Sequence, residues 1–430
     1  MTAKKTIKYI LLPTTVVIII ATLIFSINKR NNVIETNGNI NTSLDMSEYN
    51  ITTEEPTTEP ETTKEIESTT LAPSTTKKVT TTKPTTTRAT TIATTAPPPV
   101  SHSNIKGVWI SYLEIASYKN YSESQFTSKM SSCLDNVKNK GLNTVIVQVR
   151  SHGDAIYPSS YYPWSKHITS NISGGLSYDP LQIIVNLAHS KGISVHAWIN
   201  PYRTMTDAEF ASVGENYITK QWFSSANCGD YMIKSSSDSR WWLKPGNPQV
   251  RELIINGVSE IVSKYNVDAI HIDDYFYTTS PSEYGDTQSQ AKQNNTQLVS
   301  GIYNKIKAIN PNVLFGISPA GGFNAGSSIP VSDTKYLSTD LNLWCNNPGY
   351  IDYVMPQIYW EHGNATQDFS RVLRQWRSFV KCNSVALYTG LALYKLSADE
   401  INSQVVEINS TGYASGFCLF DYRSIEKLSF

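Results

Sequence analysis

Eight short apolar segments, separated by segments with helical patterns, constrain the fold of this chain more than any other feature. Each apolar segment has the length and the branched or aromatic residues that are typical of a buried strand. Regular alternation of strand and helix favours a parallel sheet covered by helices, and eight such units predict a (β/α)8 barrel of the TIM type. The predicted strands are residues 107–113, 144–150, 194–200, 269–274, 314–319, 352–360, 384–390 and 416–422.

Helix start and stop signals lie between these segments. Asp179–Pro180 and Asn247–Pro248 each open a helical pattern, and Gly192 closes the first of the two. Ser397, with Glu400 three residues later, predicts a capping box. An open doubly wound sheet is the alternative fold, but it calls for a glycine-rich phosphate turn that the sequence lacks.

Polar side chains gather toward the carboxyl end of the predicted strands. In residues 144–150, Gln148 and Arg150 share one face, and in residues 194–200 His196, Trp198 and Asn200 do so. In a barrel, one face of each strand packs on the helices and the other points into the lumen. The carboxyl ends of the strands form the mouth, where active sites of this fold lie.

The adjacent carboxylates of Asp273 and Asp274 end one of these strands. The alternation points Asp273 into the mouth and Asp274 toward the helices. A glycosidase needs a pair of carboxylates, and Glu361 and Asp421 are the further candidates for the second one. The alternative is structural, with the strand-end acids pairing with arginines or capping the next helix.

Aromatic residues near strand ends provide flat faces on which sugars stack, although for each one taken alone packing is favoured over contact with a ligand. They are Trp198, Tyr202, Tyr275, Tyr277, Tyr359, Trp360 and Tyr422. A metal site is a competing hypothesis for the polar mouth, but no HxH or HExxH spacing supports it. The histidines weighed for it are His152, His196, His271 and His362.

Seven motifs in order resemble the glycosyl hydrolase-like family 10, over essentially all of residues 105–425. They are "GVWISYL", "VQVRSHGDAIYPSSYYPWS", "HAWINPYR", "WWLKPGNPQVRELIINGVSEIV", "VDAIHIDDYFY", "FGISPAGG" and "YVMPQIYW". The resemblance implies a TIM-type barrel that hydrolyses glycosidic bonds, in peptidoglycan freed of its peptide stems. Thr278 stands where a proline is usual in the family. The matched motif positions carry over as site residues: Arg150, Asp154, Asn200, Arg203, Asp273, Asp274, Gln357, Tyr359 and Trp360.

A partial likeness to chitinase-type barrels adds a mechanistic alternative. In such a mechanism the 2-acetamido group of an amino sugar acts as the internal nucleophile, so that one protonated carboxyl and one orienting carboxylate suffice.

The first 104 residues have a different composition from the rest. Residues 9–27 are uncharged and mostly apolar, and as a helix they would span about 28 Å, enough to cross a bilayer. Residues 1–30 therefore predict an uncleaved anchor with the remainder outside the cell, and a cleaved signal peptide is the alternative. Residues 31–104, rich in Thr and Pro, predict a disordered linker to a barrel at 105–430.

Composition narrows the remaining possibilities. The net charge is zero and no basic patch stands out, which argues against nucleic acid as a partner. The five cysteines do not form metal-binding pairs, and buried thiols are favoured over disulfides. We expect no cofactor, no metal and a monomeric chain.

The sequence as a whole predicts a membrane-anchored, extracellular glycoside hydrolase that acts on a cell-wall glycan. Asp273 is the expected general acid, with Asp274 or Glu361 as its partner. The alternatives are a non-catalytic glycan-binding barrel, a hydrolase of another polysaccharide and a metal-dependent deacetylase. The residues expected to bind the substrate are Arg150, Asp154, His196, Trp198, Asn200, Tyr202, Arg203, Tyr275, Gln357, Tyr359, Trp360 and Asp421.

Overall fold

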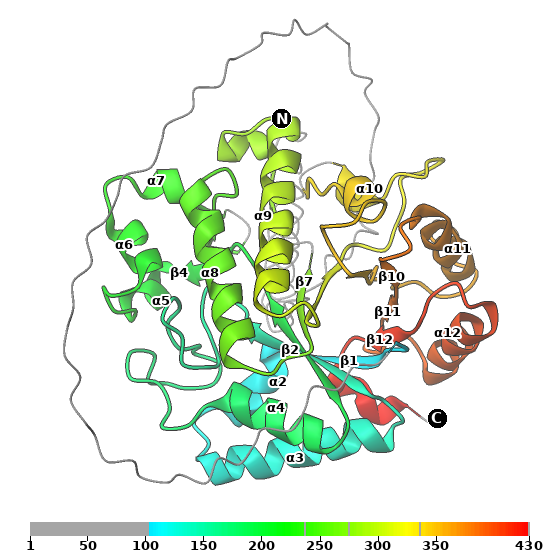
Figure 1. Cartoon of the computed structure of the whole chain (residues 1–430), viewed down its shortest axis with the longest axis horizontal. Coiled ribbons are helices and arrows are strands. Elements are labelled where there is room, and N and C mark those ends of the chain that lie inside the picture. Colours follow the sequence, from blue (N-terminus) through cyan, green and yellow to red (C-terminus); the bar gives the residue numbers. More distant parts are fainter. Residues whose placement is uncertain (1–102, 236–237, 274–275, 335–336, 429–430) are drawn as a thin grey trace, which may run out of the picture. The chain divides into compact units, whose positions relative to one another are not determined.

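A ring of parallel strands forms the centre of the domain (Figure 1). The computed structural model describes residues 103–428, except 236–237, 274–275 and 335–336. The nine strands are ordered β10-β9-β8-β7-β3-β2-β1-β12-β11. Tyr388 alone separates β10 from β11, so the sheet is a nearly closed barrel, consistent with a TIM-type fold. The strands are β1 (Lys106–Ile110), β2 (Thr144–Arg150), β3 (Ser194–Ile199), β7 (Ala269–Asp273), β8 (Leu314–Ser318), β9 (Tyr353–Val354), β10 (Ala386–Leu387), β11 (Thr389–Leu391) and β12 (Phe417–Leu419).

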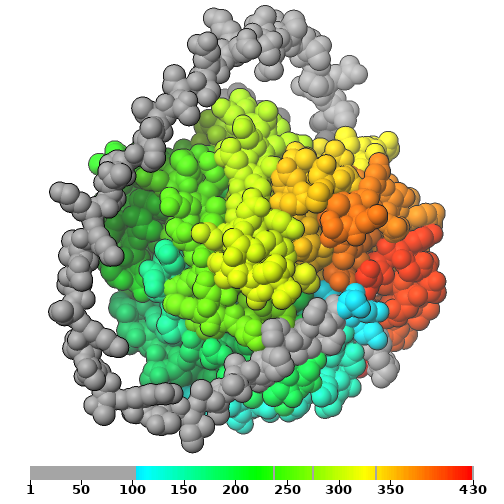
Figure 2. Space-filling view, in the orientation of Figure 1, coloured from blue at the N-terminus to red at the C-terminus, as the bar shows by residue number. Residues whose placement is uncertain are grey.

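Helices surround the strands, and their colours follow one another in chain order around the ring (Figure 1). Figure 2 shows that helices and loops cover this face of the domain. The α-helices are α2 (Tyr112–Ile115), α3 (Glu123–Asn139), α4 (Pro180–Ser190), α5 (Asp207–Ala211), α6 (Ile218–Ser224), α7 (Cys228–Tyr231), α8 (Pro248–Lys264), α9 (Gln288–Ile309), α10 (Leu341–Trp344), α11 (Phe369–Phe379) and α12 (Ala398–Thr411), and the 3-10 helices are η2 (Ala116–Tyr118), η3 (Pro281–Tyr284), η4 (Val331–Asp333) and η5 (Tyr422–Lys427).

Several predicted strands are shorter in the structure than in the sequence-based prediction: residues 107–113 end as a strand at Ile110, and residues 416–422 contribute only β12. The segment 352–360 contributes only the two residues of β9. Pro356 interrupts the ladder because it has no N–H to donate, and Gln357 beyond it forms only isolated bridges, to Ala320 and Gly390. The segment 384–390 is divided into β10 and β11.

An inserted sheet between β3 and α8 was not predicted. It consists of β4 (Arg203–Thr206), β5 (Met232–Lys234) and β6 (Arg240–Leu243), paired antiparallel in the order β4-β6-β5. Its strands are three or four residues long, too short for alternation to stand out in the sequence. The insert follows β3 directly and so lies at the carboxyl end of the barrel strands.

The predicted anchor, residues 1–30, and nearly all of the predicted linker, residues 31–104, lie outside the described part of the chain. Among the residues that the structure does describe, none of the helices is long and apolar enough to cross a membrane. The anchor and the linker therefore stay predictions.

A close approach inside the barrel requires a glycine in β8. The register places Gly316 opposite Tyr353 of β9, and the ring of Tyr353 occupies the space beside it. A Cβ atom at Gly316 would lie only 2.0 Å from Cζ of Tyr353. Because the Tyr353 ring is fully buried, it has no open space into which it can move.

We predict that Gly316→Ala lowers the free energy of unfolding by about 1–3 kcal/mol, because the added methyl group overpacks the barrel interior. Denaturant unfolding of the full chain measures the change. Gly229→Ala is the matched control, since nothing lies within 4 Å of the corresponding Cβ position. Equal stability of the Gly316→Ala variant and the unaltered chain would contradict this account of the interior.

Candidate active site

A chain of hydrogen bonds runs through the lumen to Asp273. The backbone N–H of Tyr112 donates to Oε1 of Gln148 (3.0 Å), and Nε2 of Gln148 donates to Oδ1 of Asn200 (2.5 Å). Nδ2 of Asn200 then donates to Oδ2 of Asp273 at 2.7 Å. Because a backbone N–H can only donate, it fixes the orientation of both amides. The chain therefore directs a hydrogen-bond donor at the Asp273 carboxylate, which stabilises its ionised form.

Arg203 supports the same chain from β4. Its Nε donates to the carbonyl oxygen of Ser151 at 2.9 Å, and its Nη2 lies 3.4 Å from Oδ1 of Asn200. Its guanidinium carbon lies 5.8 Å from the centre of the Tyr112 ring. Arg203 is 5 % exposed, so this cation is held inside the site rather than in solvent.

Two buried histidines meet at one tyrosine further down the lumen. Nδ1 of His196 and Nδ1 of His271 lie 3.0 and 2.9 Å from the hydroxyl oxygen of Tyr353. Nε1 of Trp109 donates to Nε2 of His271 at 3.4 Å. Burial, helped by neighbouring His196, lowers the pKa of His271 well below its ordinary value, so His271 is neutral at physiological pH. Since His271 and Asp273 are two residues apart on β7, their side chains share one face of the strand.

Arg150 does not share the face of Gln148, although the sequence predicted that it would. The register shifts between the two residues, and Arg150 pairs with Ile199 instead of continuing the lumen-facing set. Its guanidinium carbon lies 4.1 Å from the centre of the Tyr162 ring, and Gly257 of α8 leaves the space for it. The irregularity in β2 thus turns Arg150 toward Tyr162 and away from the face of Gln148, and its role in substrate binding stays a prediction.

The candidates for a second carboxylate lie in different surroundings. Asp274 lies outside the described residues, as does Tyr275. Glu361 is exposed in the loop after β9. Asp421, after β12, is 1 % exposed; its Oδ2 accepts from Nε of Arg423 at 2.9 Å, while its buried Oδ1 has no hydrogen-bond partner among the described residues. The roles of these carboxylates stay predictions.

The remaining predicted sugar contacts differ in how accessible they are. Trp198 and Tyr202 are buried, and Tyr202 packs edge-on against Phe276. Gln357 and Trp360 are partly exposed. Nε2 of Gln357 donates to the Ser318 carbonyl oxygen at 3.1 Å, which holds its side chain against the end of β8. Tyr359 is buried near the rings of Tyr394 and Phe420. Of these aromatic residues, Trp360 presents the most surface to a sugar.

Asp154 lies in the turn after β2 beside two histidines. Its Oδ1 accepts hydrogen bonds from the backbone N–H groups of Ser151 (3.0 Å) and His152 (2.8 Å). Burial and then the charge of Arg203 lower the pKa of His152 well below its ordinary value. Burial also lowers the pKa of His167 to about 4, against the opposing effect of Asp154. Both imidazoles are therefore neutral near pH 7.

The four histidines weighed as one metal set lie in three separate places. His196 and His271 meet at Tyr353, and His152 lies in the turn after β2. His362, after β9, contacts two glutamates of α12: Nδ1 lies 2.8 Å from Oε1 of Glu400, and Nε2 lies 2.8 Å from Oε2 of Glu407. Spacing along the chain could not show this separation, because each histidine belongs to a different barrel strand or loop.

The contact with His362 also explains why the predicted capping box is only half formed. Ser397 accepts from the backbone N–H of Glu400 as expected, at 3.2 Å. The Glu400 carboxylate, however, binds the backbone N–H and ring of His362 and the side chain of Gln404. It therefore ties the loop that carries Trp360 to helix α12.

Gln148, Tyr353 and His167 belong to the site but were not among the residues predicted for it. Gln148 and Tyr353 had a usable signal, because each has the strand parity of residues that were named. His167 had none: it lies in an irregular segment, where neither strand nor helix periodicity predicts the direction of a side chain.

The sequence of this chain matches a known protein family and curated relatives from two bacteria. The family described as "Glycosyl hydrolase-like 10" matches residues 104–297 and 286–407. "Glycosyl hydrolase DigH" of Escherichia coli K12 is 34% identical over 346 residues, covering 71% of this chain and 78% of that protein. "Glycosyl hydrolase YngK" of Bacillus subtilis 168 is 34% identical over 326 residues, covering 69% and 62%.

A solved structure agrees at the level of the fold. The glycoside hydrolase domain of PgaB (BpsB) from Bordetella bronchiseptica has a TM-score of 0.51 and 12% identity, and the match covers 75% of this chain and 95% of that domain. The barrel and the sequence matches together place this chain among the glycoside hydrolases. The chain belongs to the glycosyl hydrolase-like 10 family.

We predict that His362 makes the tie between its loop and α12 stronger in acid. Burial opposes protonation, but the hydrogen bonds and charges of Glu407 and Glu400 outweigh it and raise the pKa of His362 above its ordinary value. The stabilisation is therefore fully present below about pH 6.5, the ordinary value, and is lost as the pH rises through the raised pKa.

Thermal unfolding of the full chain and of His362→Gln at about pH 5.5 and about pH 8.5 measures this effect. The deficit of the variant should be larger at the acid pH. A deficit that is constant with pH, or that grows toward alkaline pH, would show that the protonated imidazole is not what holds the loop.

Proposed function

We propose that this chain is a membrane-anchored, extracellular glycoside hydrolase that cleaves the glycan strands of peptidoglycan. The observation that carries the catalytic part is the directed hydrogen-bond chain from Tyr112 through Gln148 and Asn200 to Asp273. A buried carboxylate at the carboxyl end of a barrel strand, held by a donor of fixed orientation, is the arrangement that stabilises positive charge on a sugar ring.

The hydrogen bond that Asn200 donates to Asp273 helps to decide whether Asp273 is the general acid or the ionised carboxylate of the pair. The sequence predicts that Asp273 is a general acid, which must be protonated before the reaction. The donor from Asn200 favours the ionised form instead. We therefore propose that Asp273 acts as the ionised carboxylate, which attacks or stabilises the anomeric carbon. The proton for the leaving group then comes from one of the other predicted acids, Asp274, Glu361 or Asp421.

The proposed location and substrate rest on the sequence. The apolar residues 9–27 and the Thr- and Pro-rich segment after them would hold the barrel outside the membrane, at the height of the cell wall. The motif resemblance points to envelope glycan rather than to a dietary polysaccharide. A wall glycan is also a substrate that an enzyme fixed to the cell can reach.

We predict that Asp273→Asn lowers the rate of glycan cleavage by about 10³-fold or more, because the amide cannot supply the negative charge. A substrate with a reactive leaving group, such as an aryl glycoside, separates the two roles. It needs no proton donor, so a variant lacking only the general acid would keep its activity on it.

If Asp273 is the ionised carboxylate, Asp273→Asn is inactive on both substrates. Activity retained on the aryl glycoside alone would reassign Asp273 as the general acid, and full activity on glycan strands would remove it from the site. Asp135→Asn is the matched control, since Asp135 lies on the exposed side of α3 in an ion pair with Lys191.

We predict that the full chain shortens peptidoglycan strands stripped of their peptide stems, and leaves chitin and plant glycans unchanged. Product masses report the cleavage and the sugar at each new reducing end. Strands that are retained but not shortened would favour a binding protein. Cleavage of chitin or plant glycan alone would favour another hydrolase, and acetate release that a chelator stops would favour a deacetylase.

A further inference from the structure

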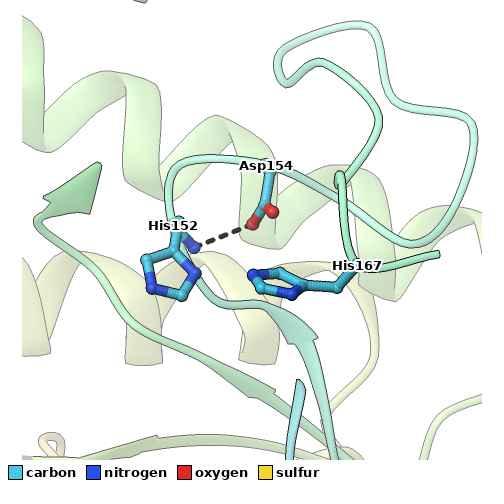
Figure 3. A group of neighbouring side chains, drawn as sticks. All are labelled: His152, Asp154 and His167. Atoms are coloured by element: carbon cyan, nitrogen blue, oxygen red, sulfur yellow. Dashed lines mark hydrogen bonds between the residues drawn. The ribbon is translucent and has the colours of Figure 1, made fainter. Parts of the chain in front are cut away.

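His152, Asp154 and His167 form a compact cluster beside the proposed active site. One possible ligand atom from each residue lies within 4.8 Å of the other two. Figure 3 shows the two imidazoles next to each other with the Asp154 carboxylate close to both. We propose that these three residues bind one divalent transition-metal ion, and that zinc is the ion this donor set fits best.

Two atoms of the cluster, Nε2 of His167 and Oδ2 of Asp154, could each bind a metal ion. Nε2 of His167 is inaccessible to solvent and has no hydrogen-bond partner among the described residues. Leaving a polar nitrogen buried without a partner is costly, and coordination to a metal ion would remove that cost. Among the described residues, the hydrogen bonds to Asp154 come from Ser151 and His152 and all go to Oδ1, so Oδ2 can serve as the third ligand.

The surrounding charges permit a cation despite the nearby basic residues. Lys166 and Arg240 both form ion pairs with Glu209, which offsets much of their charge. Arg203 is engaged by the Ser151 carbonyl oxygen and by Asn200.

Binding would draw the three side chains slightly together. In a tetrahedral site with metal–ligand bonds of about 2.1 Å, two ligand atoms of one ion are about 3.4 Å apart. The ligand atoms of the cluster lie within 4.8 Å of one another, so they would close by up to about 1.4 Å, which side-chain rotation supplies. Three protein ligands leave a fourth position open to water or to a substrate oxygen.

A bound ion would hold two loop segments of the barrel mouth in a fixed position. His152 and Asp154 belong to the turn after β2, and His167 to the irregular segment that follows, so one ion would fasten the two together. Ser151 in that turn accepts from Arg203, which in turn contacts Asn200. The ion would thus fix the outer end of the network that orients Asp273, and this proposal does not depend on which glycan is cleaved.

Titration of the chelator-treated full chain with Zn²⁺, followed by calorimetry, tests the proposal. We expect one equivalent to bind, and His167→Gln or Asp154→Asn to weaken binding by about 100-fold or more. His362→Gln is the matched histidine control and should bind zinc as the unaltered chain does.

Co²⁺ absorption gives a second readout that does not rely on activity, since visible ligand-field bands should appear in the unaltered chain and be lost in His167→Gln. Circular dichroism of each variant confirms that it is folded. Binding that survives both His167→Gln and Asp154→Asn, or that is lost in His362→Gln, would overturn the assignment. So would uptake of less than half an equivalent by the unaltered chain at about 10 µM Zn²⁺.

Discussion

The hydrogen bond from Asn200 to Asp273 is the interaction on which the proposed chemistry depends. An amide side chain can present either its oxygen or its nitrogen, and only the nitrogen supports an ionised carboxylate. The orientation of the Asn200 amide is fixed by Gln148, and the orientation of Gln148 is fixed in turn by the backbone N–H of Tyr112. The orientation of the donor at Asp273 is therefore set by the path of the main chain after β1.

The side chains in the barrel lumen below this network are closely packed. The lack of a side chain at Gly316 leaves room for the Tyr353 ring in the lumen, and the Tyr353 hydroxyl contacts His196 of β3 and His271 of β7. Trp109 approaches His271 from β1. Side chains from four strands thus interlock in one layer, and such packing holds the carboxylate above it in a single position.

Much of the fold could be predicted from the sequence, because alternation and helix caps are local signals. The residues of β2 were predicted without error, and Asp179 and Ser397 begin their helices as expected. Contacts that bring distant segments together had no such signal. The shift in β2 that turns Arg150 toward Tyr162 breaks the alternation at a point that the sequence does not mark. The approach of His167 to His152 depends on an irregular segment.

The central claim is that Asp273 reacts as an ionised carboxylate stabilised by Asn200. The pH dependence of kcat/KM for glycan cleavage, compared between the unaltered chain and Asn200→Ala, tests it most directly. Because the variant lacks the donated hydrogen bond, the acid limb of its profile should move to higher pH. An acid limb that stays in place, or that moves to lower pH, would contradict this account.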